Sequence, residues 1–304
     1  MHDHSHPPAR DPKASRFDRA FAIGIALNTG FVLVEWIFGV MANSLALIAD
    51  ASHNLGDVLA LLLAWGAAVL ARRRPSARFT YGLRSTTILA ALINAALLLL
   101  ITGGIAWEAV LRFRNPAGVD ASVVIWVAAL GIAVNTGTAL LFMSGRKRDM
   151  NLRGAYLHMA ADAAVSAGVV AAGLLTLATG WIWLDPVASL AIVTVILLGT
   201  WGLLRDATRL ALHAVPEGVD PTEVRRYLER QPGVREVHDL HIWGMSTTET
   251  AMTAHLVMPE GHPGDEFIAR LGVEMNCEFG IAHATLQVEI GSAQRCVLAP
   301  DHVV

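Results

Sequence analysis

Hydrophobic residues dominate the first two-thirds of the chain and fall into six long runs separated by short polar segments. A helix needs about 20 such residues to cross the hydrocarbon core of a bilayer. The pattern therefore predicts six transmembrane helices, at residues 19–40, 44–70, 85–111, 120–143, 152–179 and 184–204. Only Met41 to Asn43 separate the first two runs, which predicts a tight helical hairpin.

Beyond residue 206 the long apolar runs give way to short segments with helical or alternating patterns. Helices are predicted at 220–230 and 263–279, each bounded by Pro or Gly, and strands at 234–243, 248–258 and 282–290. The order α-β-β-α-β predicts a small α+β domain in which two helices pack on a three-stranded sheet.

These patterns divide the chain into four predicted regions. A disordered arm is expected at 1–16 and a loose tail at 293–304, with a six-helix transmembrane domain at 17–206 and a cytoplasmic domain at 207–292 between them. The predicted fold class is an α-helical membrane protein with a C-terminal α+β domain. The arm contains three histidines that either bind metal weakly or belong to a solvated tail, namely His2, His4 and His6.

Charge separates the same two parts of the chain. Charged residues make up 16% of the sequence, against about 25% in an average soluble domain. Residues 1–206 carry a net charge of +4 and residues 207–304 a net charge of −7. The acidic C-terminal part argues against nucleic acid as a partner.

Basic residues between the runs set the orientation in the bilayer. With the N-terminus inside, the only basic residues in the outer loops are Arg112 and Arg114. The cytoplasmic side then holds Arg10, Lys13, Arg16, Arg19, Arg72, Arg73, Arg74, Arg78, Arg84, Arg146, Lys147, Arg148 and Arg153. We therefore predict a multi-pass protein of the cell's inner (plasma) membrane with both termini cytoplasmic.

Two of the apolar runs carry the same polar pair. His53 and Asp57 are four residues apart, as are His158 and Asp162, so each pair lies on one face of a helix. Ionisable groups are costly inside a membrane, so they usually face a bundle interior and mark an ion path. Two imidazoles and two carboxylates supply the four ligands of a tetrahedral Zn²⁺ site. All four groups also bind protons, which predicts exchange of metal for H⁺.

Other polar residues in the spans are given supporting roles. Asp50 precedes His53 by one turn, and three roles are open to it: a hydrogen-bonding partner of that histidine, a stop on the ion path, or a helix-packing residue. Glu35, near the outer end of its span, is predicted to be a solvated carboxylate. Packing hydrogen bonds are predicted for Asn28, Asn94 and Asn135.

Histidines also occur along the predicted strands of the C-terminal region. The candidate metal ligands there are His238, His241, His255 and His283, together with Glu289. The alternative is that these histidines are structural or idle at the surface. Strand alternation places His238 opposite to Asp239 and to His241, so the two histidines share a site only if the strand bends.

Taken together, these motifs resemble the cation diffusion facilitators, and in particular their zinc-exporting type. The resemblance covers nearly the whole chain and rests on the six spans, on the stretch Ser44 to Asp57, and on His158-Met-Ala-Ala-Asp162, His238-Asp-Leu-His-Ile-Trp243 and Ala254-His-Leu256. It implies a homodimer that exports Zn²⁺ from the cytoplasm by H⁺-driven alternating access. It also implies a metallochaperone-like cytoplasmic domain that dimerises and binds regulatory zinc.

The resemblance can be carried over position by position. It makes the transport site from His53, Asp57, His158 and Asp162. In this family His at the first of these positions, rather than Asp, is associated with zinc over cadmium. His238 and His255 match soluble-domain ligands of some members. Where some bacterial members have His and Asp on the last strand, this chain has Gln287 and Glu289, of which Glu289 is the expected ligand.

Three alternatives stay open at this point. Co²⁺, Cd²⁺, Fe²⁺ or Ni²⁺ could be the cargo, because the order of affinities does not fix biological selectivity. A membrane-bound metal sensor that does not transport would need the same ligands. An intramembrane metalloenzyme typically carries a motif such as His-Glu-x-x-His, which the sequence lacks, so we do not expect an enzyme.

Overall fold

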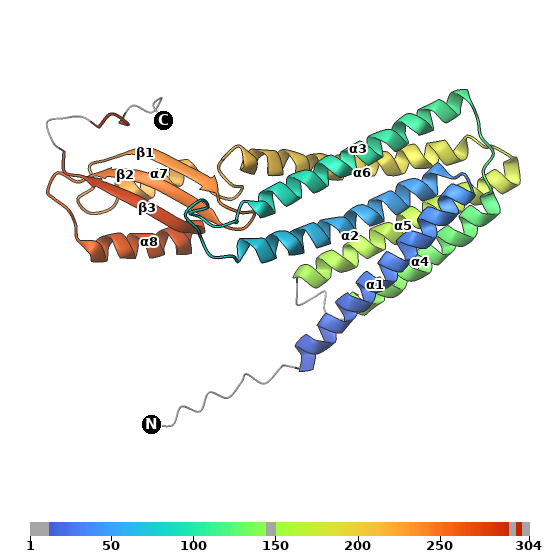
Figure 1. Cartoon of the computed structure of the whole chain (residues 1–304), viewed down its shortest axis with the longest axis horizontal. Coiled ribbons are helices and arrows are strands. Elements are labelled where there is room, and N and C mark those ends of the chain that lie inside the picture. Colours follow the sequence, from blue (N-terminus) through green and yellow to red (C-terminus); the bar gives the residue numbers. More distant parts are fainter. Residues whose placement is uncertain (1–11, 144–149, 292–295, 300–304) are drawn as a thin grey trace. The chain divides into compact units, whose positions relative to one another are not determined.

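The computed structural model describes residues 12–143, 150–291 and 296–299, with the backbone alone in 12–25, at 142 and in 150–155 (Figure 1). The predicted features at 1–11, 146–148 and most of the tail lie outside this part. The described residues contain six long helices: α1 (Pro12–Met41), α2 (Leu45–Ala71), α3 (Thr86–Arg114), α4 (Ala121–Met143), α5 (Met150–Thr179) and α6 (Leu184–Ala211).

These helices overlap all six predicted spans. Among the described residues, five helices are long and apolar enough to cross a membrane, and the apolar stretch Ala26–Met41 of α1 is shorter. Helix α1 begins at Pro12, inside the segment expected to be an arm, and α6 continues to Ala211, past the boundary expected at residue 206. The helical membrane fold class is confirmed.

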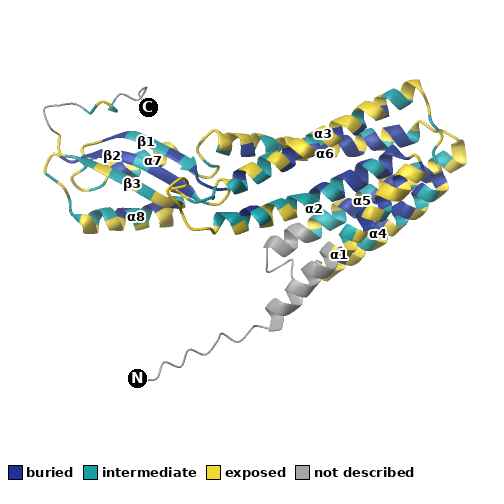
Figure 2. Ribbon diagram, in the orientation of Figure 1, coloured by how far each residue is buried: buried dark blue, intermediate teal, exposed yellow. Residues whose placement is uncertain are grey.

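Contacts divide the chain into two units, Met1–Leu61 with Ala96–Trp201 and Leu62–Ala95 with Gly202–Val304. In the first unit α4 packs along α5, and α1 packs on α4. Its apolar core is built from every helix that enters it, and Figure 2 shows the buried residues along these helices. At Gly131 a Cβ would lie 2.7 Å from the ring of Phe31 and 3.0 Å from Ser166 Oγ, so this glycine lets three helices approach closely.

A buried carboxylate fixes the start of α2, the helix that carries the first His-Asp pair. The Oδ2 atom of Asp185, on α6, accepts the backbone N–H of Leu45 at 2.8 Å, and its Oδ1 atom accepts the hydroxyl of Ser44. Arg112 lies 3.8 Å from the same carboxylate and balances its charge. Asp185 therefore serves the fold, because it satisfies N–H groups that a helix start leaves without partners.

The second unit contains the predicted α-β-β-α-β order. Its elements are α7 (Pro221–Glu229), β1 (Glu236–Gly244), β2 (Thr250–Val257), α8 (Asp265–Phe279) and β3 (Ile281–Glu289). Asp220 caps α7 by accepting the N–H of Thr222 at 2.8 Å, and Gly280 ends α8 in a left-handed conformation with φ 67°. The sheet order is β1-β2-β3, antiparallel and then parallel.

Both short helices pack against one face of this sheet. Leu228 of α7 and Met275 of α8 share an apolar core with Met252, Ala254 and Leu256 of β2. Since side chains alternate along a strand, the residues between these, including His255, face the other side of the sheet. The candidate ligands of this domain therefore lie on the face that the helices leave uncovered.

Candidate metal centres

The first cluster of candidate ligands lies between α2 and α5, within the first unit. His158 Nε2 lies 3.1 Å from Asp57 Oδ2 and 3.6 Å from Asp162 Oδ2. His53 Nε2 lies 3.8 Å from a carboxylate oxygen of Asp57 and of Asp162. The structure thus brings together all four residues that the i, i+4 spacing singled out.

The donor separations suit a tetrahedral ion. With metal–ligand bonds of about 2.0–2.1 Å, the N and O donors of a tetrahedral zinc site lie about 3.3 Å apart. The four histidine–carboxylate separations, 3.1 to 3.8 Å, differ from this by up to 0.5 Å, and one donor atom each of His53, His158 and Asp162 lies within 4.8 Å of the other two. The rings of His53 and His158 meet edge to face, with centroids 6.0 Å apart. Two carboxylates among the four ligands would neutralise a divalent cation.

Exposure changes from one end of this cluster to the other. The Asp57 and His158 side chains are 37% and 41% exposed, whereas that of Asp162 is 4% exposed. One turn further in the same direction, Asp50 and Ser166 are both buried. The cluster is therefore open on the side of Asp57 and His158 and closed on the side of Asp50.

A second carboxyl pair lies at the closed side. Glu35 and Asp50 are 0% and 1% exposed, and one carboxylate oxygen of each has no hydrogen-bond partner among the described residues. Asn54 donates to Glu35 and Ser166 donates to Asp50, each at 3.3 Å. The prediction that Glu35 is solvated was wrong, because α1 turns this side chain toward α2.

Two other sequence predictions for the spans can be checked against this geometry. Among the described hydrogen bonds, Asp50 accepts one from Ser166, and His53 is not a partner. Asn135 is 0% exposed, and neither polar atom of its side chain has a hydrogen-bond partner in the described part of the chain. The packing hydrogen bond predicted for Asn135 was wrong.

A bulge in β1 shapes the second cluster, in the C-terminal domain. The register shifts between His238 and His241, and Asp239 adopts a left-handed φ of 50°. As a result His238 pairs with His255 and His241 pairs with Thr253, on the same face of the sheet. Strict alternation predicted that His238 and His241 lie on opposite faces unless the strand bends. The bulge is such a bend, and it places both histidines on one face.

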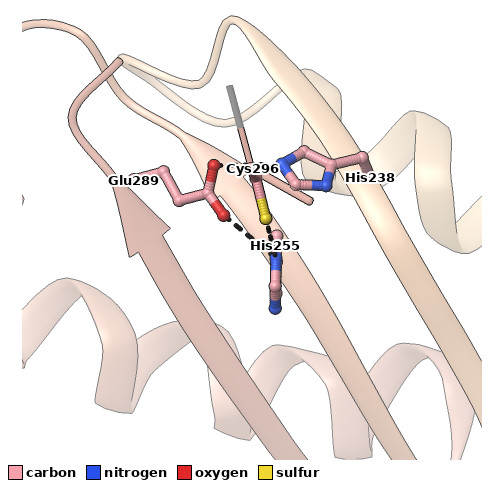
Figure 3. Close-up of side chains that lie close together, drawn as sticks. All are labelled: His238, His255, Glu289 and Cys296. Atoms are coloured by element: carbon pink, nitrogen blue, oxygen red, sulfur yellow. Dashed lines mark hydrogen bonds and ion pairs between the residues drawn. The ribbon is translucent and has the colours of Figure 1, made fainter. Parts of the chain in front are cut away.

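Four side chains converge on this face of the sheet: His238, His255, Glu289 and Cys296 (Figure 3). One donor atom of each lies within 4.8 Å of those of the other three. Glu289 contacts both rings, at 3.2 Å from His238 Nε2 and 3.0 Å from His255 Nδ1. Cys296 Sγ lies 3.8 Å from the same His255 Nδ1.

Neighbouring polar groups orient these side chains. His255 Nε2 lies 3.3 Å from Asp239 Oδ2, so the ring's other nitrogen, Nδ1, is the one that faces the cluster. Gln287 donates to Glu289 Oε1 at 3.2 Å. His241 is 2.8 Å from Asp239 and reaches the cluster only through that carboxylate.

The remaining candidate lies elsewhere on the sheet. His283 packs edge to face on Tyr81, with ring centroids 5.7 Å apart, and is not one of the four clustered residues. Sequence reasoning missed two residues that the structure places at the cluster, Asp239 and Cys296. The only signal for Cys296 was a soft ligand type a few positions after Glu289.

Electrostatics differ between the two acidic donors of this cluster. Burial raises the pKa of Glu289, but hydrogen bonds with Cys296 and His238 outweigh it, so the pKa lies below its ordinary value. A backbone hydrogen bond at Leu298 lowers the pKa of the Cys296 thiol, but partial burial and the Glu289 carboxylate raise it above its ordinary value. At neutral pH Glu289 is ionised, whereas the thiol keeps its proton until a metal displaces it.

The helices and the two clusters define a multi-pass membrane protein with metal-ligating side chains in both of its parts. Residues 21–210 match the family model of the cation efflux transmembrane domain, and residues 216–290 match that of the cation efflux protein cytoplasmic domain. The chain therefore belongs to the cation efflux family. This confirms the resemblance to the cation diffusion facilitators.

Relatives share nearly the full length of the chain. It is 36% identical to the zinc transporter ZitB of Escherichia coli (strain K12), over 95% of this chain and 92% of ZitB. It is 34% identical to the cation efflux system protein CzcD of Alcaligenes sp. (strain CT14), over 97% and 91%. It is 33% identical to the cadmium, cobalt and zinc/H(+)-K(+) antiporter of Bacillus subtilis (strain 168), over 89% and 88%.

Among solved structures, an isolated cytoplasmic domain is similar to part of the chain. The metal-bound C-terminal domain of the CzcD transporter from Cupriavidus metallidurans is 35% identical, with a TM-score of 0.22. It covers 23% of this chain and 99% of that domain.

Proposed function

We propose that this protein is a Zn²⁺/H⁺ antiporter that moves zinc out of the cytoplasm by alternating access. The observation that carries the proposal is the set of four donors from α2 and α5, at separations suited to zinc. Two imidazoles give the borderline-soft ligands that zinc accepts, which disfavours Mg²⁺ and Mn²⁺. The similarity to the zinc transporter ZitB and to the Bacillus cadmium, cobalt and zinc antiporter supports a zinc cargo.

The same four groups account for coupling to protons. Zinc binding requires neutral histidines and ionised carboxylates, so it displaces any protons that they hold. Without metal, two adjacent carboxylates in a low-dielectric bundle are stable only when protons or protonated histidines compensate them. The negative charge of the carboxylates is thus balanced in two states, with metal bound or with protons bound. In either state the site can change from facing one side of the membrane to facing the other.

The exposure of the ligands supports an inward-facing state. With both termini cytoplasmic, α2 runs from outside to inside and α5 runs the opposite way. Asp57 and His158, the exposed pair, then lie on the cytoplasmic side, whereas Asp50 and Ser166 close the outer side. Zinc enters from the cytoplasm in this state, which is the loading step of an exporter in the cell's inner membrane.

We further propose that the protein is a homodimer whose cytoplasmic domain binds regulatory zinc. The matching model of this domain is named for dimerisation, which supports the dimer. Within the second unit, Ser85 at the start of α3 donates to the carbonyl of Met245 at 3.2 Å, and Arg84 pairs with Glu249. A metal that orders the sheet would act on α3 through these contacts.

Transport assays in proteoliposomes test the function. With a zinc-sensitive dye inside, we expect wild-type protein to move zinc at a rate that depends on an imposed pH gradient, and Asp162→Ala to abolish this flux. His283→Ala, outside both clusters, serves as the matched control and keeps it. A membrane-bound sensor gives no flux in wild type, and zinc flux retained in Asp162→Ala refutes the site. Competition by Co²⁺, Cd²⁺, Fe²⁺ and Ni²⁺ ranks the cargoes.

A further inference from the structure

We propose that Cys296, from the segment after the last strand, is a thiolate ligand that completes a four-donor metal site with His238, His255 and Glu289. The inference rests on the proposed metal binding by the cytoplasmic domain and adds a residue from outside the matched domain, which ends at 290. Cys296 thereby belongs to the site, although it lies in the segment expected to be a loose tail. Figure 3 shows the thiol beside the His255 ring and the Glu289 carboxylate.

The separations fit a tetrahedral site with one sulfur. With bonds of about 2.3 Å to sulfur and about 2.05 Å to nitrogen, the S and N donors lie about 3.6 Å apart. Cys296 Sγ and His255 Nδ1 are 3.8 Å apart. The N and O donors of such a site lie about 3.3 Å apart, and Glu289 is 3.0 and 3.2 Å from the two rings.

The position of His255 gives an independent reason to place a metal here. Its Nε2 atom meets the Asp239 carboxylate at 3.3 Å, so a proton on Nε2 leaves the Nδ1 lone pair directed at Glu289 and Cys296. A carboxylate oxygen 3.0 Å from a bare lone pair makes a poor hydrogen-bonding arrangement, whereas the carboxylate, the thiol and the lone pair together make a good ligand set. His238 and His255 are only 3% and 8% exposed, so this orientation is held by the sheet.

Charge and access also suit a soft divalent cation. A thiolate and a carboxylate balance its two charges, and the two histidines stay neutral. A cavity of about 480 Å³ is lined by His238, Glu289 and Cys296 and gives an ion a route in. The sulfur ligand favours Zn²⁺ and Cd²⁺ over Mg²⁺ and Mn²⁺. The membrane cluster has only N and O donors, so it also disfavours Mg²⁺ and Mn²⁺ through its imidazoles but offers Cd²⁺ no soft ligand.

Cobalt spectroscopy on the full-length protein tests the thiolate directly. The chain has only two cysteines, Cys277 and Cys296, so a sulfur-to-cobalt charge-transfer band reports one of them and never the membrane cluster. We expect Co²⁺ to give this band in wild type and in the control Cys277→Ser, and Cys296→Ser to lose it. Zn²⁺ should displace the band. A band that persists in Cys296→Ser, or never forms in wild type, overturns the proposal.

A thiol-protection assay gives a second readout that does not depend on cobalt. In Cys277→Ser, zinc should slow alkylation of Cys296 by at least about tenfold, because a metal-bound thiolate is no longer free to react. In Cys296→Ser, zinc should leave alkylation of the exposed Cys277 unchanged. Equal rates with and without zinc at Cys296 refute the ligand. Loss of zinc flux in wild-type proteoliposomes would instead refute the transport function and leave both readouts intact.

Discussion

The two clusters have similar donor atoms, but they differ in how far apart the ligands lie in the sequence and in how exposed the ligands are. In the membrane, two helices each supply one histidine and one carboxylate from adjacent turns, and Asp57 and His158 stay more than a third exposed. In the cytoplasmic domain the donors come from three strands and the following segment, and both histidines are buried. One cluster is assembled from two adjacent helical turns on each of two helices, and the other is assembled from residues far apart in the sequence with its histidines buried.

The histidines of the two clusters also differ in whether a hydrogen-bond partner holds the ring nitrogen that faces away from the metal site. His53 Nδ1 is buried with no hydrogen-bond partner among the described residues, whereas the far nitrogen of His255 meets Asp239. A carboxylate behind a histidine fixes the ring and strengthens metal binding. A transport site must release its ion in every cycle, so looser ligands suit it. A regulatory site must stay occupied at low metal concentration, so oriented ligands suit it.

The largest effect should come from removing one acidic ligand from each cluster in turn. Asp57→Asn leaves a divalent ion with a single carboxylate in a low-dielectric bundle, so we expect zinc flux to fall by at least about 100-fold. Glu289→Gln should leave the maximal flux within about twofold and raise the zinc concentration for half-maximal flux about tenfold. Zinc uptake into proteoliposomes, measured over a range of zinc concentrations, gives both values.

The comparison fails if the two variants behave alike. A loss of maximal flux in Glu289→Gln would mean that the cytoplasmic cluster belongs to the transport cycle. A normal maximal flux in Asp57→Asn would mean that the membrane cluster is not the path of the ion. Circular dichroism of both purified variants should match wild type, since neither substitution changes the size of the side chain appreciably.

The buried carboxyl pair at the closed side of the membrane cluster should give an intermediate effect. Glu35→Gln keeps the packing and the contact with Asn54 but removes a group that can release a proton. We expect zinc flux about tenfold slower, with metal binding unchanged, because intramembrane carboxyl groups mark ion and proton paths. Stopped-flow flux and equilibrium zinc binding in detergent separate the two. Weakened binding with no further loss of rate would make Glu35 part of the metal site instead.

The membrane half of this comparison could be predicted from the sequence. Long apolar runs set the six helices, and a helix turns about 100° per residue, so His53 with Asp57 and His158 with Asp162 had to share faces. The pattern could not predict which side of α1 packs against the other helices. Glu35 sits in a helix that is apolar on nearly every side, so only its neighbours decide which way it points.

The cytoplasmic half was less predictable for two physical reasons. The order of strands and helices follows from local turn residues, but a bulge depends on one residue in a left-handed conformation, and Asp239 carries no pattern that announces it. Asp tolerates this conformation better than most residues. Cys296 lies after a segment without periodicity, so its return to the sheet depends on long-range contacts alone.

The smallest effect should separate the two residues that the bulge brings near His255. Asp239→Asn removes the charge that holds the His255 ring, so we expect the cytoplasmic cluster to bind zinc about tenfold more weakly. His241→Ala should change the affinity by less than about threefold, because its polar contact among the described residues is with Asp239 and its side chain is 42% exposed. Isothermal titration with zinc, in protein carrying Asp162→Ala to silence the membrane cluster, measures both. If His241→Ala bound zinc more weakly than Asp239→Asn, the result would mean that the bulge places His241 in the metal site and that Asp239 does not orient His255.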